Sequence, residues 1–302
     1  MPDPYVVRTT PGIVELWSPV RLPFEPRGWL IDMRNDLRRA LHSLSPTPNG
    51  HLHAVYGAAN DGAFVDTENV LLYNVGGTAL RPLGRNAVTF ERRYQVPSPP
   101  VGDGLQNDQA LHYHRYSEAG DAPTEFWRPG RQLGAFFDVP VNVLDKPAPV
   151  FKAIREYAAP PSDTASTPTQ FYIDVQITDT RQSRSAGSVV SIIKPALDGI
   201  ISAYHGHGGS DGSDEARRLE LSEVGTADAL RDHLLDGRWA ALGTRRLVRP
   251  FGAAGVQWNP ADEFCVFARI SLSTGEAVAD TDARWRLTAK LSEAKFDESK
   301  ES

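Results

Sequence analysis

Residues 188–214, SVVSIIKPALDGIISAYHGHGGSDGSD, decide the fold, because they hold the most regular apolar pattern in the chain. Lys194 and Asp198, four residues apart, share a narrow polar side and can meet there. Pro195 fits a first helical turn, where its missing N–H has no helical partner. The stretch predicts a helix that begins near Ser191, ends at two histidines and has a broad apolar face, made of Ile192, Ile193, Ala196, Leu197, Ile200, Ile201 and Tyr204.

Lys194 has two interpretations. An exposed ion pair with Asp198 would contribute roughly 0.3 kcal/mol and carry no function. A lysine on a mostly buried helix would instead face a cleft and hold an anion, such as a phosphate group. The pattern alone leaves both interpretations open.

The remainder of the chain alternates between helix-like and strand-like segments. Amphipathic helices are expected over 28–44, 147–159 and 226–237, and the alternating FYIDVQITD (171–179) predicts a strand. RRLELSEV (217–224) also predicts a strand. We therefore expect an α+β fold in which a mixed β-sheet packs against a few helices.

Two fused units are a further expectation. The order helix, loop, strand, polar turn, apolar run occurs twice, over 28–77 and over 149–209. We place a first α/β unit, which carries Asp66 and Glu68, at 1–145. A second, which carries Lys194 and Asp198, follows at 146–290, and a charged tail at 291–302.

Composition narrows the class of protein. The formal net charge is −6, so the chain lacks the overall basic balance of a typical nucleic-acid binder, although four arginines lie close together between residues 81 and 93. The single cysteine, Cys265, excludes an intrachain disulfide and a cysteine-based metal cluster. The beginning of the chain has no signal-peptide pattern, and no apolar run approaches a membrane span, so we expect a cytoplasmic protein with no membrane partner.

A family resemblance enters at KPALDGIISA (194–203), which follows the predicted strand 171–178. This arrangement resembles the core of RusA-type Holliday-junction resolvases, whose pattern is roughly Asp-x-Asp-Asn-x-x-Lys-x-x-x-Asp-Ala-Leu. Lys194 matches the lysine, and residues 198–200 match the Asp-Ala-Leu end. In that family the first two acids bind a divalent metal and the lysine assists at the phosphate.

The chain departs from this pattern at the acids. Their two positions fall on Ser188 and Val190, and the asparagine position falls on Ser191. A hydroxyl and an isopropyl group cannot replace carboxylates as magnesium ligands. The second unit therefore cannot cleave DNA by the family mechanism on its own.

The first unit has the acidic residues of the resolvase pattern that the second unit lacks. VDTENVLLYN (65–74) places Asp66, Glu68 and Asn69 in the Asp-x-Asp-Asn spacing, whereas Leu72 stands at the lysine position. The resemblance thus implies a composite site in which Asp66 and Glu68 hold Mg²⁺ and Lys194 contacts phosphate. Asp211 or Asp214 would add a third carboxylate to this site. The alternative is that DTEN is a solvated turn in which Asp66 or Asn69 caps a short helix.

Six of the eight histidines form His-x-His pairs, at 51/53, 112/114 and 205/207. Residues i and i+2 of a strand share a face, so a pair can chelate zinc or iron when an acid lies nearby. His112 and His114 lie in a predicted strand and are the candidates for such a site. His205 and His207 follow the Lys194 helix, where a protonated imidazole would suit the helix dipole.

Three functional hypotheses follow. The first is a nucleic-acid-associated protein of RusA-like fold, acting on DNA or RNA, whose Mg²⁺-dependent nuclease site has diverged or been lost. Its catalytic residues would be Lys194 and Asp198, and its metal ligands Asp66 and Glu68. The second is a non-enzymatic subunit that binds protein partners in a complex, and the third is a histidine-dependent metal hydrolase.

Overall fold

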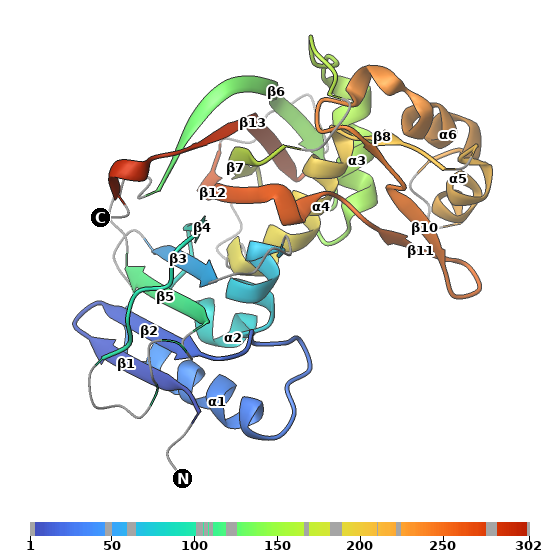
Figure 1. Ribbon diagram of the computed structural model, residues 1–302. Helices are drawn as coiled ribbons and strands as arrows, with labels where there is room; N and C mark the ends of the chain where they lie inside the picture. The colour runs from blue at the N-terminus through green and yellow to red at the C-terminus, as the bar shows by residue number, and fades with distance from the viewer. Residues whose placement is uncertain are drawn as a thin grey trace.

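Nine strands of the described residues form one mixed sheet (Figure 1). The computed structural model describes residues 4–45, 50–58, 65–100, 105, 108, 111–118, 126–165, 169–181, 189–209, 211–221, 225–275 and 283–300. From one edge of the sheet to the other, the strands are β1 (Val6–Thr10), β2 (Ile13–Ser18), β5 (His112–Glu118), β3 (His51–Ala58), β4 (Ala87–Arg93), β12 (Cys265–Thr274), β7 (Phe171–Asp179), β13 (Trp285–Phe296) and β6 (Trp127–Val141). Two short pairs lie outside it, β8 (Gly206–His207) with β9 (Thr244–Arg245) and β10 (Val248–Phe251) with β11 (Gly255–Trp258).

Helices accompany the sheet, and Figure 1 shows α1, α2, α4 and α3 in succession along it. None of the helices in the described ranges is long and apolar enough to cross a bilayer. The α-helices are α1 (Trp29–Leu41), α2 (Gly77–Leu80), α3 (Pro147–Tyr157), α4 (Ile193–Ala203), α5 (Ser213–Glu220) and α6 (Ala227–Leu235). The other helical turns are a π-helix, η1 (Asn69–Tyr73), and the 3₁₀ segments η3 (Val189–Ser191), η4 (Gly237–Trp239), η5 (Asp262–Phe264) and η6 (Glu298–Lys300).

The expected α+β fold with a mixed sheet is confirmed. Alternation in β7 buries Phe171, Ile173 and Ile177 completely, as a strand with one core face requires. Helix α4 contributes its apolar face to the same core. It begins at Ile193, after the 3₁₀ turn η3, so Pro195 occupies its third residue and still lies in the first turn.

The segment 217–224 was expected to be a strand, and this expectation is wrong for residues 217–220, which end helix α5. Ala216 and Leu219, three residues apart, are its buried apolar residues, and that spacing belongs to a helix. Two acidic residues in the first turn, Asp214 and Glu215, also favour a helical start.

The two halves of the sheet share one strand order. Read outward from the centre, β4-β3-β5-β2 and β12-β7-β13-β6 each begin with a parallel pair and continue with antiparallel pairs. Strands β4 and β12 join the halves in antiparallel fashion. The correspondence concerns strand order, and it does not establish that the halves are duplicated.

The expected unit boundaries need two corrections. Strand β6 falls within the expected first unit, 1–145, yet it pairs with β13 at the far edge of the other half. A charged tail was expected from residue 291, whereas β13 continues to Phe296, with Leu291 and Ser292 buried.

This sheet order places two connections side by side. A parallel strand pair needs a crossover connection, and β3–β4 and β7–β12 are the two parallel pairs nearest the centre. The β3–β4 crossover carries η1 and α2, and the β7–β12 crossover carries η3 and α4. Because β4 and β12 are neighbours, the crossovers meet, and α2 contacts η3.

Candidate functional site

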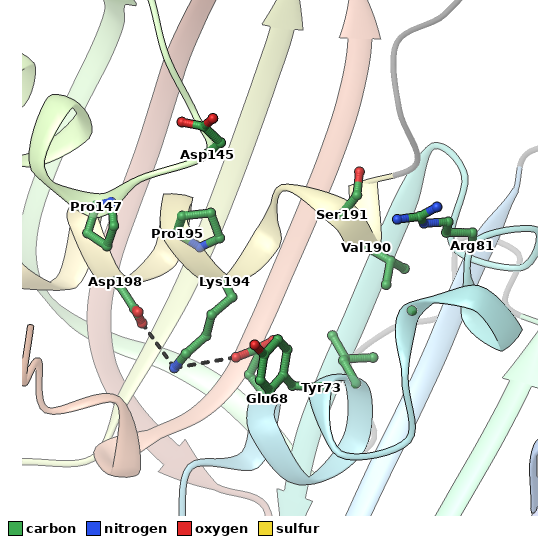
Figure 2. A pocket seen from close by; sticks show the side chains of 12 residues that line it. Glu68, Tyr73, Arg81, Asp145, Pro147, Val190, Ser191, Lys194, Pro195 and Asp198 are labelled. Carbon is green, nitrogen blue, oxygen red and sulfur yellow. Dashed lines mark ion pairs between the residues drawn. The ribbon is translucent and has the colours of Figure 1, made fainter. Parts of the chain in front are cut away.

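The ammonium group of Lys194 lies among four carboxylates. Its Nζ is 2.9 Å from Asp66 Oδ2, 2.8 Å from Asp262 Oδ2, 3.1 Å from Asp198 Oδ1 and 3.6 Å from Glu68 Oε2. Figure 2 shows the Lys194 side chain reaching from α4 to a point between Asp198 and Glu68. Side chains from both crossovers therefore meet at one point, and we call these five residues the lysine–carboxylate cluster.

Asp66 and Glu68 precede the π-helix η1. The backbone N–H of Asn69 donates to Asp66 Oδ1 at 3.0 Å, while Asp66 Oδ2 accepts from Lys194. Asp66 thus caps a helical turn, as the second interpretation of DTEN expected, and also joins the cluster, but the turn is buried at Thr67 and Glu68 and is not solvated. Tyr116 Oη donates to the Leu71 carbonyl at 2.8 Å and fixes η1 to β5. Single π-helical turns are found frequently at functional sites.

Close packing of α4 on α3 sets the position of Lys194 and Asp198. At Gly199, a Cβ atom would meet Val150 Cβ at 2.6 Å and the Pro147 carbonyl oxygen at 2.7 Å. The absence of a side chain there lets the two helix backbones approach each other. Lys194 and Asp198, one turn apart, then project from α4 toward the β3–β4 crossover.

Asp262 was not anticipated from the sequence, and it comes from η5, just before β12. Hydrogen bonds fix the two residues directly before Asp262. The Ala261 N–H donates to His205 Nε2 at 3.3 Å, and Arg245 Nη1 donates to the Pro260 carbonyl at 3.0 Å. The His205 Nδ1 lies 3.0 Å from the Gly243 carbonyl. Both ring nitrogens of His205 are occupied, so this residue positions the Asp262 turn and is not a metal ligand.

The electrostatics of the cluster reflect burial and crowding. Burial raises the pKa of Asp66 to about 6 and that of Glu68 to about 8, although Lys194 acts in the opposite direction. Burial also raises the pKa of Asp198. For Lys194, burial alone would lower the pKa, but the four carboxylates outweigh it and hold the pKa well above its ordinary value. The lysine is therefore charged, and the acids around it compete for protons.

A cavity of about 410 Å³ opens beside the cluster. Its lining includes Lys194, Glu68 and Asp198 from the cluster, together with Tyr73 and Arg81 (Figure 2). Arg81 follows α2 directly and is exposed. An anion in this cavity would therefore meet two positive side chains, one from each crossover.

Several other sequence candidates lie elsewhere. Asp214 pairs with Arg218 on α5, and Asp211 Oδ1 accepts from the Ser213 N–H, so the expectation that either adds a carboxylate to the site is wrong. The cluster takes its further carboxylates from Asp198 and Asp262 instead.

The remaining histidines are built into the fold. His112 Nδ1 lies 2.8 Å from Tyr56 Oη, and His114 Nδ1 lies 3.2 Å from Tyr116 Oη. Burial lowers the pKa of His114 to about 3, so its ring is neutral. His207 is buried on β8. Among the described residues, no three His, Cys, Asp or Glu side chains form a preformed metal site.

The resemblance to the resolvases has one further outcome. Ser188, at its first acid position, lies outside the described residues, whereas Val190 and Ser191 line the cavity. Residues that the sequence did not single out for the site are Asp262, Tyr73 and Arg81. A carboxylate directly before a central strand was the one available signal for Asp262.

The chain matches no protein-family model, no curated protein and no solved structure.

Proposed function

We propose that this protein binds nucleic acid and that the lysine–carboxylate cluster is a diverged, Mg²⁺-dependent phosphodiester-cleaving site of the RusA type. One observation carries the proposal. Lys194 and the two acids Asp66 and Glu68, the separate parts of the implied composite site, meet within 3.6 Å across two crossovers.

The charge balance of the cluster supports a site for a cation. Four carboxyl groups surround one ammonium group, so acids outnumber the cation even when Glu68 is protonated, as its raised pKa of about 8 favours near neutral pH. A purely structural ion pair needs one acid for each lysine, and extra buried acids cost stability. Such crowding of titratable groups beside a cavity is typical of functional sites.

The donor atoms fit a hard divalent cation. Carboxylate oxygens are the ligands that Mg²⁺ prefers. Glu68 Oε2 and Asp198 Oδ1 are buried, and Lys194 Nζ is an ion-pair partner of both, at 3.6 Å and 3.1 Å. The ion would be held by the four carboxylates of the cluster, Asp66, Glu68, Asp198 and Asp262. When bound, it would polarise a phosphoryl oxygen and activate a water molecule. Because the Lys194 ammonium now lies at the centre of these acids, it must turn aside for the ion to bind.

The protein's own residues then have distinct tasks. Lys194, displaced toward the cavity, can donate to a phosphate oxygen and balance the charge that develops there. Arg81 lines the same cavity and offers a fork of donors that suits a second phosphate oxygen. His205 keeps Asp262 in place through Ala261.

The test is a cleavage assay on single-stranded DNA, single-stranded RNA and branched DNA, with Mg²⁺, Mn²⁺ or a chelator. We expect metal-dependent cleavage that falls at least about 100-fold in Asp66→Asn and Lys194→Ala, because each removes a group that acts on the reacting phosphate. The matched control is Asp174→Asn, which changes a half-buried carboxylate on β7 that pairs with Arg269, outside the cluster. Loss of activity in Asp174→Asn to the same degree would contradict the assignment.

A second candidate function has its own observation. The Lys194 ammonium contacts all four carboxylates, so it can take the place of a metal ion. The protein would then be catalytically inactive and would only bind nucleic acid or protein partners. Equal and negligible cleavage by the wild type and the variants, with nucleic-acid binding retained, would favour this alternative.

A further inference from the structure

Two exposed aromatic rings stack on each other at the edge of the cavity. Phe24 is 56% exposed and Tyr73 is 53% exposed, and their ring centroids lie 5.1 Å apart with an interplanar angle of 8°. Tyr73 also lines the cavity beside Lys194 (Figure 2). Large aromatic side chains usually bury their rings, so a stacked pair in solvent presents flat apolar surface to a partner.

The stack is held firmly against the cluster. Tyr73 is the last residue of the π-helix η1, and Glu68 is the residue directly before that helix. The adjacent Asn74 donates from Nδ2 to the Leu22 carbonyl at 2.8 Å, and Leu22 is completely buried. These contacts join the Phe24 loop to the segment that carries the acids. The distance between the rings and the cluster is therefore set by the fold.

Arginines are available to contact a phosphate backbone, although the cavity is also lined by the acids Glu68, Asp145 and Asp198. Arg81 lines the cavity together with Tyr73. Arg21 and Arg27, in the same loop as Phe24, are exposed, and Glu25 is the one acid between them. Flat aromatic faces next to arginines are the pattern by which proteins hold unpaired nucleotides, because every base has a face that can stack.

We propose that Phe24 and Tyr73 form a base-stacking platform that holds an unpaired nucleotide beside Lys194, so that the substrate class is single-stranded nucleic acid, or the single-stranded part of a branched one. This inference rests on the proposed function, since it takes the phosphodiester at Lys194 as the reacting group. A base stacked on the outer face of the pair would place its own phosphate toward the arginines and the cavity.

The test measures binding without metal, so that it does not depend on cleavage. Fluorescence anisotropy is recorded in chelator with a labelled oligothymidine, with an abasic strand of equal length and charge, with the corresponding duplex and with oligouridine. We expect the abasic strand and the duplex to bind about 5- to 100-fold more weakly than oligothymidine, the range that loss of one stacked base produces. Tighter binding of oligouridine than of oligothymidine would identify RNA as the source of the strand, and the reverse would identify DNA.

Variants assign the effect to the two rings. Phe24→Ala and Tyr73→Ala should each weaken oligothymidine binding about 5-fold or more, whereas Tyr73→Phe retains the ring and should bind like the wild type. Phe137→Ala is the matched control, because Phe137 is 77% exposed on β6 and does not line the cavity. All these residues are exposed, so the variants are expected to fold, which thermal unfolding verifies.

Failure of this inference can be told apart from failure of the proposed function. Equal binding of the abasic and normal strands, or unchanged binding by both alanine variants, overturns the platform whether or not the protein cleaves. Base-dependent binding that is lost in both alanine variants, in a protein that does not cleave with any metal, supports the platform and overturns the nuclease.

Discussion

Lys194 Nζ lies 2.9 Å from Asp66 Oδ2, although 128 residues separate the two in the chain. The sheet explains this contact. Antiparallel pairing of β4 with β12 brings two crossovers together, one after β3 and one after β7. Neither crossover holds all five residues of the lysine–carboxylate cluster, so the cluster depends on the joint between the two halves of the sheet.

Replacement of Lys194 by methionine should destabilise the protein by about 3–5 kcal/mol near neutral pH, because it leaves four mostly buried carboxylates without their cation. Added Mg²⁺ or Ca²⁺ should restore part of that stability, since either ion can take the place of the ammonium. Urea unfolding with and without the metal measures both effects.

The control is Lys152→Met. Lys152 pairs with Glu156 on α3 at a partly exposed i,i+4 site, where the pair contributes less than about 1 kcal/mol. A Lys194→Met variant that is no less stable than Lys152→Met, and that gains nothing from divalent ions, would contradict the cation role of Lys194.

Glu68→Gln should flatten the pH dependence of stability. The folded-state pKa of Glu68 is raised by burial to about 8, so between about pH 4.5 and 8 the folded protein keeps a proton that the unfolded chain has lost. Stability therefore falls as pH rises through this window, and Asp66, with its pKa raised to about 6, adds to the fall. Lys194, whose pKa is also raised, adds a further fall only in the alkaline range, and Asp198 and Asp262 also face Glu68.

Chemical unfolding across this pH range measures the effect. Glu68→Gln should be at least about 1 kcal/mol more stable than the wild type near pH 8, and the difference should vanish near pH 4. The variant keeps the shape of the side chain, so packing is unchanged. Parallel pH profiles for the wild type and Glu68→Gln would show that Glu68 is ionised in the folded protein throughout.

Much of the fold follows from local pattern, whereas the site follows from topology. The alternation of Phe171, Ile173 and Ile177 and the apolar face of α4 are visible in the sequence, because burial on one face repeats at a fixed period. Spacing also singled out Asp66 and Lys194. Asp262 has no periodic signal, and its role depends on long-range strand pairing that no local pattern encodes.

The strand predicted over 217–224 was wrong at 217–220 because the local pattern there does not determine the structure. A short run that mixes leucine with charged residues fits both a strand and a helix, and it is the packing of Ala216 and Leu219 that selects the helix. In the described part of the chain no histidine pair belongs to a group of three potential metal ligands, because the spacing i, i+2 fixes the face that two strand residues share but not the residues opposite them. His112 and His114 contact tyrosines.

His205→Phe should lower stability, because it leaves the buried Ala261 N–H without its acceptor, whereas the Gly243 carbonyl still accepts from the Gly206 N–H. The expected loss is about 1–3 kcal/mol for the unsatisfied N–H. It should also change acid sensitivity. Burial lowers the pKa of His205 to about 4, so the wild type loses stability as pH falls below about 6.5, where the unfolded histidine takes up a proton.

Unfolding curves between about pH 7 and 4 test this assignment, because the phenylalanine variant lacks the titrating group and should lose less stability over that range. His112→Phe serves as a control at a half-buried histidine, since His112 contacts Tyr56 on the sheet and does not contact the Asp262 turn. An acid profile that is the same in the wild type and in His205→Phe would mean that His205 is protonated in the fold and holds the Asp262 turn differently.

Gly199→Ala should destabilise the protein, although alanine normally stabilises a helix by up to about 1 kcal/mol relative to glycine. The added Cβ would lie 2.6 Å from Val150 Cβ and 2.7 Å from the Pro147 carbonyl oxygen, and backbone atoms cannot move aside as a flexible side chain can. Forced separation of α3 and α4 should cost about 1–3 kcal/mol and displace Asp198, which lies next to Gly199, from Lys194.

Gly237→Ala is the matched control, because no atom lies within 4 Å of its added Cβ, and it should be neutral or slightly stabilising. Thermal unfolding of both variants measures the difference, and a Gly199→Ala protein as stable as Gly237→Ala would show that α4 can shift without cost and that the cluster is not held by this helix contact.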